Sequence, residues 1–243
     1  MTSVNELAGK TAIVTGGSGG IGSAIIRSLQ QAGAVATSLD LSPSPDKDIP
    51  WLQCDVRSDD SVGSAVQQFF QQNGRLDLVV HAAGISREAV VWKLAVEDWD
   101  LIQAVNLRGA FLLLRHTIPL MRQGQGGRMV LIGSINGSRG KFGTSAYSAS
   151  KAGLLGLAKS VARETGRLGI LVNVIEPGWV RTPLTESLPR EVRQAAEEES
   201  PLGTLLEVSD VAAAVLFLCG PGARRITGQI LRVDAGQFLG GGT

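Results

Sequence analysis

Residues 10–22 read KTAIVTGGSGGIG, a short β-branched apolar run that ends in a glycine-rich turn. The run predicts a buried parallel strand. The apolar positions that follow, among them Ile21, Ile25 and Leu29, predict a helix that begins at the turn. Strand, turn and helix together favour a dinucleotide-binding unit, because bare backbone lets a pyrophosphate approach the free N–H groups of the helix N-terminus.

The glycines of this turn fit two dinucleotide-binding patterns. One match is G-x-G-x-x-G over residues 17–22, and the other is T-G-x-x-x-G-x-G over residues 15–22. A glycine pattern also occurs in plain loops, so the strand before it and the helix after it carry the prediction. The cofactor-binding residues predicted in the turn are Gly16, Ser18, Gly19, Gly20, Ile21 and Gly22.

The second predicted strand ends in Asp40, roughly 20 residues beyond the glycines. A carboxylate there accepts hydrogen bonds from the adenosine ribose and repels an added 2′-phosphate. Neither the glycine turn nor Leu41-Ser42 supplies an arginine or lysine that would hold that phosphate. The sequence therefore predicts NAD(H) in preference to NADP(H). The alternative is that Asp40 caps the turn before Ser42-Pro43-Ser44-Pro45.

Composition limits the class of protein. The 243 residues include 23 basic and 22 acidic side chains, and this net charge of +1 argues against nucleic acid or an anionic membrane as a partner. Met1–Glu6 lacks the apolar core of a signal peptide, and the longest apolar run, Val211–Cys219, is too short to span a bilayer. We therefore expect a soluble, cytoplasmic protein. The two cysteines and two histidines are isolated, which predicts neither a metal site nor a disulfide.

Apolar runs alternate with amphipathic helical patterns along the chain, and no Pro/Gly/Ser linker divides it. This alternation predicts a single α/β domain, residues 1–243, around a parallel sheet. The predicted strands are residues 10–15, 34–40, 51–56, 76–80, 128–134, 170–175 and 229–234. A polar, proline-punctuated segment near residues 182–205 predicts a substrate lid, the alternative being a solvated surface helix.

Three helices carry end signals or an unusual residue. Ser58 and Asn73-Gly74 mark the two ends of one helix, and Ser209-Asp210 is expected to cap the last one. A long helix is predicted from Glu97 to Met121, with Asn106 in its middle. Because asparagine is a poor helix former, Asn106 is interpreted as a kink point, a solvated position or a residue whose carbonyl holds a water.

Tyr147 and Lys151 are four residues apart at the start of a predicted helix, which places both side chains on one face. A tyrosine with an unperturbed pKa of about 10 does acid/base work near neutrality only where a cation favours the phenolate. The pair therefore indicates a proton-transfer site, the alternative being a half-buried tyrosine beside a solvated lysine. Ser134 ends the fifth strand, and His81 is interpreted as a hydrogen-bonded structural residue.

Taken in order, these residues resemble the short-chain dehydrogenase/reductases. The resemblance rests on Thr15–Gly22, Asn106, Ser134 and Tyr147-x-x-x-Lys151, and it covers essentially all of the chain. Further matches are Asp55, Ala82-Ala83-Gly84, Asn173, Pro177-Gly178 and Thr227-Gly228-Gln229. The chain length and the segment Gly84-Ile85-Ser86-Arg87 look most like the 3-oxoacyl-[acyl-carrier-protein] reductase type.

The resemblance implies a Rossmann-type doubly wound parallel sheet, strand order 3-2-1-4-5-6-7, and a homotetramer. It implies that Tyr147 transfers a proton, that Lys151 lowers the Tyr147 pKa and contacts the nicotinamide ribose, and that Ser134 holds the substrate oxygen. Asn106 would hold a water linked to Lys151. The implied cofactor contacts beyond the glycine turn and Asp40 are Asp55, Val56, Ala82, Ala83, Gly84, Tyr147, Lys151, Pro177, Gly178, Val180 and Thr182.

Three departures separate the chain from fatty-acid-type reductases. Those enzymes commonly use NADPH with a basic residue in the glycine loop, which is absent here. The two arginines that they present to acyl carrier protein are Gln125 and Leu168 in this sequence, which argues against docking to a carrier protein. Glu176 replaces a small residue before Pro177-Gly178. It is interpreted as a solvated or hydrogen-bonded structural residue, the alternative being a place in the substrate pocket beside Trp179.

The sequence thus predicts an NAD(H)-dependent oxidoreductase that interconverts a secondary alcohol and a ketone. A 3-hydroxyacyl or 3-oxoacyl thioester, carried on CoA or a carrier protein, is the first substrate expected. One alternative is a dehydrogenase of a cyclic or aromatic secondary alcohol. A different class is a non-catalytic NAD-sensing regulator, for which a broken Ser134, Tyr147 or Lys151 position would be expected.

Overall fold

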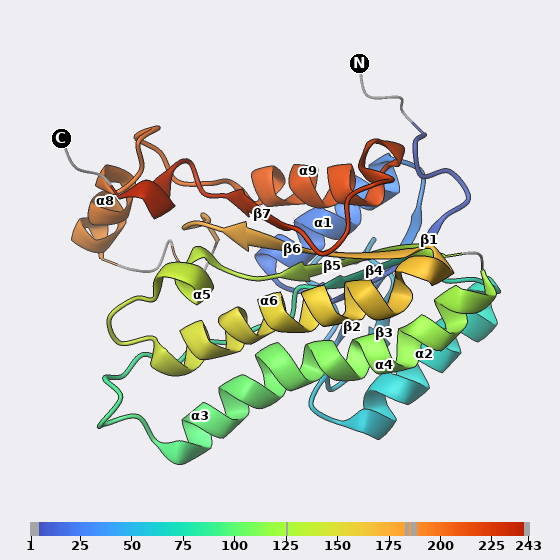
Figure 1. Ribbon diagram of the computed structural model, residues 1–243, viewed down its shortest axis with the longest axis horizontal. Helices are drawn as coiled ribbons and strands as arrows, with labels where there is room; N and C mark the ends of the chain where they lie inside the picture. The colour runs from blue at the N-terminus through green and yellow to red at the C-terminus, as the bar shows by residue number, and fades with distance from the viewer. Residues whose placement is uncertain (1–4, 125, 183–184, 186–188, 241–243) are drawn as a thin grey trace.

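One parallel sheet organises the chain, which a computed structural model describes over residues 5–124, 126–182, 185 and 189–240 (Figure 1). Its seven strands run in the order β3-β2-β1-β4-β5-β6-β7, and every neighbouring pair is parallel. The doubly wound order expected from the sequence is therefore confirmed. The strands are β1 Thr11–Thr15, β2 Val35–Asp40, β3 Trp51–Gln53, β4 Leu78–His81, β5 Gly127–Ile132, β6 Ile170–Pro177 and β7 Ile230–Val233.

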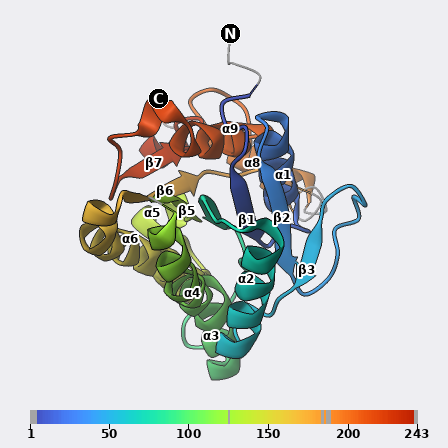
Figure 2. The same cartoon turned by 90° about the vertical axis from the view of Figure 1, so that its right-hand side faces the viewer.

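Helices cover both faces of the sheet. In the end-on view of Figure 2, α1 (Gly20–Gln31) and α9 (Val208–Cys219) lie on one face. The opposite face carries α2 (Asp59–Asn73), α4 (Gly109–Gln123) and α6 (Ser145–Thr165). Because crossover helices bury both faces, the central strands need continuous apolar runs, which is what their sequences have.

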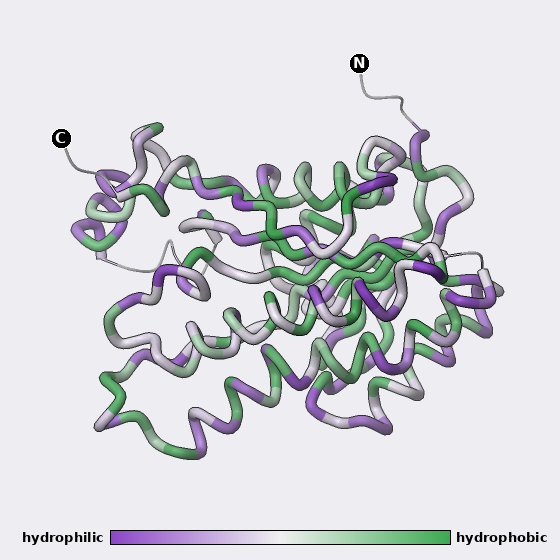
Figure 3. Tube along the Cα trace, viewed as in Figure 1, coloured by the Kyte–Doolittle hydropathy of each residue, from purple (hydrophilic) through white to green (hydrophobic). Residues whose placement is uncertain are grey.

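The apolar core is divided by the sheet into two clusters of buried residues. Ile13 and Val79 face the cluster that includes Phe69 of α2, whereas Ala12 and Val14 face the cluster under α1 and α9. Figure 3 shows the same pattern as apolar strands between helices with polar outer faces. Each fully buried aliphatic side chain stabilises the fold by about 2 kcal/mol relative to leaving it in water.

The helix ends agree with the sequence in one case and differ in another. Ser58 caps α2 by accepting a hydrogen bond from the Ser61 N–H (3.2 Å), and Gly74 ends it at φ 72°, a left-handed conformation that favours glycine. The expected cap of α9 at Ser209-Asp210 is wrong. Glu207 is the N-cap of α9. The Asp210 carboxylate, three residues further on, accepts a hydrogen bond from the Glu207 N–H at 2.8 Å, and the two residues form a reciprocal capping box.

The long helix predicted from Glu97 to Met121 is divided in three. It consists of α3 (Val96–Gln103), a π-helical turn η1 (Ala104–Arg108) and α4. The sixth strand, predicted over residues 170–175, is longer than expected, because β6 continues through Glu176 to Pro177. The missing N–H of proline is tolerated at the last position of the strand, and the Gly178 N–H restores the ladder by donating to Val233 O at 2.8 Å.

Short elements complete the edge of the sheet where the strands end. Here lie α5 (Ile135–Arg139) and α8 (Arg190–Glu198), on the left in Figure 1. The remaining turns are η2 Gly166–Leu168, η3 Pro221–Ala223 and η4 Gln237–Leu239. Residues 183–184 and 186–188 of the expected lid lie outside the described residues, as does Met1–Val4 of the N-terminal segment. None of the helices in the described part of the chain combines the length and apolarity needed to cross a membrane.

Candidate active site

The glycine turn after β1 is too close to its neighbours to accept side chains. A Cβ on Gly16, which has φ 69°, would lie 2.7 Å from the backbone of Ala83, and one on Gly22 would overlap the carbonyl oxygen of Gly16. Gly19 is exposed, caps α1 and has no side chain to bind the first N–H groups of that helix. Ser18, Gly20 and Ile21 are half-buried beside it. The turn thus leaves the positive end of α1 open to an anion.

Asp40 lies beside this turn at the end of β2. Its Oδ2 accepts hydrogen bonds from the Ser18 N–H (3.1 Å) and the Ser18 hydroxyl (2.5 Å), and its Oδ1 accepts from the Leu41 N–H (2.7 Å). The contact with Leu41 is the local one expected of a turn cap. The contacts with Ser18, 22 residues away, hold the carboxylate beside the glycine turn, where a cofactor-binding acid is expected.

His81 ends β4, and three small residues, Ala82, Ala83 and Gly84, continue the edge after it. His81, at the end of the strand, is fully buried, and its ring lies 2.9 Å from Thr15 Oγ1 and 3.3 Å from Asn106 O. Burial, reinforced by the charge of Lys151, lowers the pKa of His81 to about 3, so the ring is neutral. Its interpretation as a structural residue is confirmed. Next to it, the bare Cα of Gly84 leaves room for Lys151, whose Nζ would lie 3.2 Å from an added Cβ, while Ala82-Ala83 packs on the glycine turn.

Asn106 is fully buried, and both polar atoms of its side chain are hydrogen-bonded. Its Nδ2 donates to Ile85 O (3.0 Å) and Ser150 Oγ (2.9 Å), and its Oδ1 accepts from the Ile85 N–H (2.8 Å). The interpretation as a solvated position is therefore wrong, and the irregularity is a π-helical turn instead. This turn joins the segment after β4 to α6, and π-helical turns of this kind are frequent at functional sites.

Ser134 is the N-cap of the short helix α5, which the sequence analysis missed. Its Oγ accepts a hydrogen bond from the Asn136 N–H at 3.2 Å, and the side chain is buried. The hydroxyl hydrogen stays available for donation, and the Ser134 hydroxyl lies close enough to the Tyr147 phenol to lower the pKa of that phenol. The cap therefore fixes the serine oxygen beside the tyrosine.

Tyr147 and Lys151 lie on one face of α6, as predicted. The Lys151 Nζ is 5.7 Å from the centroid of the Tyr147 ring and donates to the carbonyl oxygen of Ile132 at 2.8 Å. Burial lowers the pKa of Lys151 to about 8. Burial also raises the pKa of Tyr147, and the hydrogen bond with Ser134 opposes that rise. In the structure without cofactor, desolvation of the phenol therefore outweighs its polar neighbours, and the lowering of the Tyr147 pKa by Lys151 stays a prediction.

The remaining predicted cofactor residues follow β3 and β6. Asp55 pairs with Arg57 at 2.7 Å, which lowers the pKa of the carboxyl, and Val56 packs on the bare Cα of Gly109. Pro177-Gly178 ends β6 against β7. Val180 is buried in a parallel bridge with Leu206, and the Thr182 N–H donates to Thr185 Oγ1 at 2.8 Å. All of them lie at the edge where the parallel strands end.

Glu176 is fully buried, and both oxygens of its carboxylate accept hydrogen bonds. The Ser138 hydroxyl donates to its Oε1 at 2.6 Å, and Arg232 Nη2 donates to its Oε2 at 3.2 Å. The hydrogen-bonded structural reading is confirmed and the solvated one is wrong. The pair links α5, and thereby Ser134, to β6 and β7.

Two residues of the site carried no signal in the sequence. Ser150 accepts from Asn106 and donates to the carbonyl oxygen of Tyr147 at 2.7 Å, so it joins the π-helical turn to α6. Ile132 contributes only its backbone carbonyl to Lys151. A serine within a helix and a main-chain carbonyl have no distinctive pattern, so neither was predictable. Among the described residues, no His, Cys, Asp and Glu side chains cluster as metal ligands.

Comparison with known proteins agrees with this geometry. Residues 16–237 match the family model described as enoyl-(acyl carrier protein) reductase. The chain is 34% identical to acetoacetyl-CoA reductase of Acinetobacter sp. (strain RA3849), over 95% of this chain and 98% of that protein. It is 34% identical to the 3-oxoacyl-[acyl-carrier-protein] reductase FabG of Thermotoga maritima, over 96% of this chain and 100% of that protein.

Solved structures give the same result. Thermoplasma acidophilum aldohexose dehydrogenase superposes with a TM-score of 0.93 at 29% identity, over 98% of this chain and 97% of that one. The crystal structure of gox2181 superposes with a TM-score of 0.92 at 31% identity, over 96% and 97%. Fold, site and relatives agree over nearly the whole chain, which therefore belongs to the short-chain dehydrogenase/reductases, nicotinamide-dependent oxidoreductases, and is most like their 3-oxoacyl-[acyl-carrier-protein] reductase type.

Proposed function

We propose that this protein is an NAD(H)-dependent oxidoreductase that interconverts a secondary alcohol and a ketone, with a 3-hydroxyacyl or 3-oxoacyl thioester as substrate. The observation that carries the proposal is the meeting of Ser134, Tyr147 and Lys151 at the edge of the sheet that also holds the glycine turn. A hydrogen-bond donor, a phenol and an ammonium there supply what carbonyl reduction needs beyond a hydride.

The glycine turn and its surroundings fit a dinucleotide. No side chain binds the first N–H groups of α1, so its N-terminus suits a pyrophosphate, and the bare Cα of Gly84 leaves space beside Lys151. The nicotinamide, when bound, supplies or accepts the hydride. Residues that would hold the dinucleotide are the glycine turn, Asp40, Asp55-Val56, Ala82-Ala83-Gly84, Tyr147, Lys151, Pro177-Gly178, Val180 and Thr182.

The side chains divide the proton chemistry between them. The Ser134 hydroxyl, held by its capping hydrogen bond, donates to the substrate oxygen and fixes its position. The Tyr147 phenol gives its proton to that oxygen in reduction and takes it back in oxidation. Lys151 holds its place through Ile132 O, and the network of Asn106, Ile85 and Ser150 keeps α6 in register with the segment after β4.

NAD(H) is preferred to NADP(H) in this proposal because of Asp40. The N–H and hydroxyl of Ser18, the glycine-turn donors that lie beside Asp40, are already bound to the Asp40 carboxylate and would not be free to hold a 2′-phosphate. A phosphate at this position would have to break the hydrogen bonds between Ser18 and Asp40, and it would be repelled by the negative charge of the Asp40 carboxylate. Relatives named as 3-oxoacyl-[acyl-carrier-protein] reductases support the choice of substrate, as does the one named acetoacetyl-CoA reductase.

CoA is the proposed acyl carrier in preference to a carrier protein. Leu168 stands where a carrier-binding arginine is expected, and it lines a surface cavity with Ile118 and Arg122, while Gln125 lies outside the described residues. A second candidate substrate, a cyclic secondary alcohol, is favoured by the structural likeness to an aldohexose dehydrogenase. The homotetramer, the cytoplasmic location, the single domain of residues 1–243 and the lid near residues 182–205 stay predictions.

Replacement of Tyr147 by phenylalanine tests the proposal. We expect Tyr147→Phe to fold, to bind NADH and to lose nearly all turnover on a panel of 3-oxoacyl thioesters and cyclic ketones assayed with NADH and NADPH in parallel. Ser145→Ala is the matched control, because Ser145 Oγ is buried on the same helix without a hydrogen-bond partner in the described structure. Near-normal turnover in Tyr147→Phe would remove the assignment, and the best substrate of the panel decides between thioester and cyclic alcohol.

A further inference from the structure

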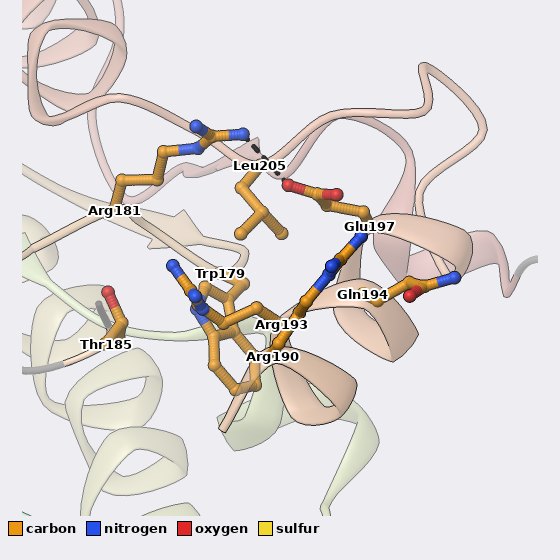
Figure 4. Close-up of a pocket in the computed structure, with 8 residues that line it drawn as sticks. All are labelled: Trp179, Arg181, Thr185, Arg190, Arg193, Gln194, Glu197 and Leu205. Carbon is orange, nitrogen blue, oxygen red and sulfur yellow. Dashed lines mark hydrogen bonds and ion pairs between the residues drawn. The ribbon is translucent and has the colours of Figure 1, made fainter. Parts of the chain in front are cut away.

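A cavity of about 350 Å³ lies between the end of β6 and α8 (Figure 4). Its lining is rich in arginine and includes Trp179, Arg181, Arg190, Arg193, Glu197 and Leu205. Three arginines against one glutamate leave the lining with an excess of two positive charges. Nothing in the proton chemistry described above uses these residues.

The positive charges of the cavity are only partly neutralised. Arg181 pairs with Glu197 at 2.9 Å and with Glu207 at 3.5 Å. Figure 4 shows the pair of Arg181 and Glu197 at the upper rim. The ion pairs formed within the described part of the chain include none from Arg190 or Arg193. A further cation, the Lys141 Nζ, lies 4.8 Å from the centroid of the Trp179 ring.

Two hydrogen-bond donors of the lining are buried without a partner among the described residues, namely Trp179 Nε1 and Arg193 Nε. A buried donor without an acceptor costs about 1–3 kcal/mol, so native proteins rarely leave one without a reason. Indole and guanidinium groups donate only and accept nothing. The ligand that satisfies both is therefore an acceptor, and the surplus of positive charge makes it an anion.

The cavity lies at the same edge of the sheet as the proposed catalytic residues, where the parallel strands end. Trp179 follows Pro177-Gly178 at the carboxyl end of β6, and Lys141, over its ring, lies in the segment between α5 and α6. These two helices carry Ser134 and Tyr147. A substrate whose carbonyl is held there has the rest of its length available to reach the cavity.

We propose that this cavity binds an oxyanion, a phosphate or a carboxylate, on the part of the substrate remote from the reacting carbonyl, with Arg193, Arg190 and the Trp179 indole N–H as donors. The inference rests on the proposed function for the identity of the substrate. The phosphates of CoA and a carboxylate at the far end of the acyl chain share this chemistry.

Three thioesters distinguish these two sources. Acetoacetyl-CoA carries phosphates, acetoacetyl-N-acetylcysteamine carries neither anion, and the N-acetylcysteamine monothioester of a 3-oxo dicarboxylic acid carries only the carboxylate. We expect Arg193→Met to lower kcat/KM for one anionic thioester relative to the neutral one by about 10- to 100-fold, the loss of a charge-assisted hydrogen bond. The thioester that loses its advantage identifies the anion. Arg225→Met, an exposed arginine in the turn before β7, is the matched control and leaves the ratio unchanged.

Removal of a negative charge from the cavity lining separates loss of anion recognition from damage to the fold. Glu197→Gln frees Arg181 from its closest partner, so we expect the same ratio to rise. Damage to the fold would lower the activity on all three thioesters in both variants. NADH affinity, measured by fluorescence, stays constant in Arg193→Met, and a weakened NADH complex would assign the cavity to the cofactor and overturn the inference.

Calorimetry with coenzyme A and with adipate tests the cavity without turnover. If the unsubstituted protein reduces no thioester yet binds either anion through Arg193, the proposed function is wrong and the inference of an anion-binding cavity is supported. If the protein reduces thioesters with the same anionic preference in Arg193→Met, the cavity inference fails and the function stands. Absence of Arg193-dependent binding of both anions likewise overturns the inference.

Discussion

The Lys151 ammonium lies 5.7 Å from the centroid of the Tyr147 ring on the same face of α6, yet burial moves the two pKa values in opposite directions. The pKa of Lys151 falls to about 8, while that of Tyr147 rises from its ordinary value of 10.0. We therefore expect the lysine to lose its proton before the phenol does in the protein without cofactor.

This order is measurable because Tyr147 is the one tyrosine of the sequence. We expect the ultraviolet absorbance of tyrosinate to titrate with a midpoint above 10 in the free protein, recorded after a rapid pH jump so that the chain stays folded. Lys151→Met is expected to leave that midpoint nearly unchanged, since a neutral lysine contributes no charge. A midpoint below 10 that rises in Lys151→Met would show the opposite, a charged lysine that stabilises the phenolate.

The free energy of unfolding should depend on pH because the Lys151 ammonium is buried. Below pH 8 both the folded and the unfolded protein carry the charge, so the folded state bears the full cost of burying it. As pH rises from about 8 towards 10.5, the folded protein alone loses this proton and the cost disappears. We expect Lys151→Met to raise the free energy of unfolding by about 2 kcal/mol at pH 7, after allowing about 1 kcal/mol for the lost hydrogen bond to Ile132, with a smaller gain at pH 10.

Urea unfolding of both proteins at the two pH values measures this difference. Lys159→Met, an exposed lysine of the same helix, is the matched control and should change the stability by less than about 0.5 kcal/mol at either pH. A gain for Lys151→Met that does not depend on pH would attribute the effect to packing.

Local sequence signals were sufficient for the parallel sheet, the glycine turn and the pairing of Tyr147 with Lys151, whereas the strand order came from the family resemblance. The run before Gly16 and the spacing of Tyr147 and Lys151 are patterns of neighbouring residues, and parallel strands bring their carboxyl ends to one edge. The partners of those residues were not predictable. Arg232, which donates to Glu176, is 56 residues away from it. Asn106, whose side-chain amide donates to the carbonyl oxygen of Ile85, is 21 residues away from it.

The π-helical turn at Asn106 has the same cause. Propensity alone marks the residue as unfavourable in a helix, but the turn forms because Ile85 and Ser150 approach it from two other segments. The raised pKa of Tyr147 is also tertiary in origin, since the depth of burial is a property of the packed fold. Patterns in sequence thus located the chemistry, and tertiary contacts set its energetics.

Removal of the Asn106 amide should destabilise the protein strongly. Asn106→Ala leaves the N–H and carbonyl of Ile85 without their partner and removes one of the two hydrogen bonds of the Ser150 hydroxyl, so we expect the free energy of unfolding to fall by about 2–4 kcal/mol. Asn73→Ala, which removes one half-buried bond to Phe69 O, should cost about 1 kcal/mol or less. Equal losses in the two variants, measured by urea unfolding, would mean that the buried network adds nothing beyond a single hydrogen bond.

The last prediction concerns the choice of cofactor. Asp40→Ser removes the carboxylate and frees the N–H and hydroxyl of Ser18 for a 2′-phosphate. Two like charges about 4 Å apart repel by several kcal/mol near a protein surface, less after screening by salt. We therefore expect kcat/KM for NADPH relative to NADH to rise by about 10- to 100-fold in Asp40→Ser. Asp48→Ser makes the same charge change at an exposed carboxylate of the loop after β2 and should leave the ratio unaltered. A preference of the unsubstituted protein for NADPH would contradict this prediction, because the hydrogen bonds between Asp40 and Ser18 would then have to open for the phosphate at no measurable cost.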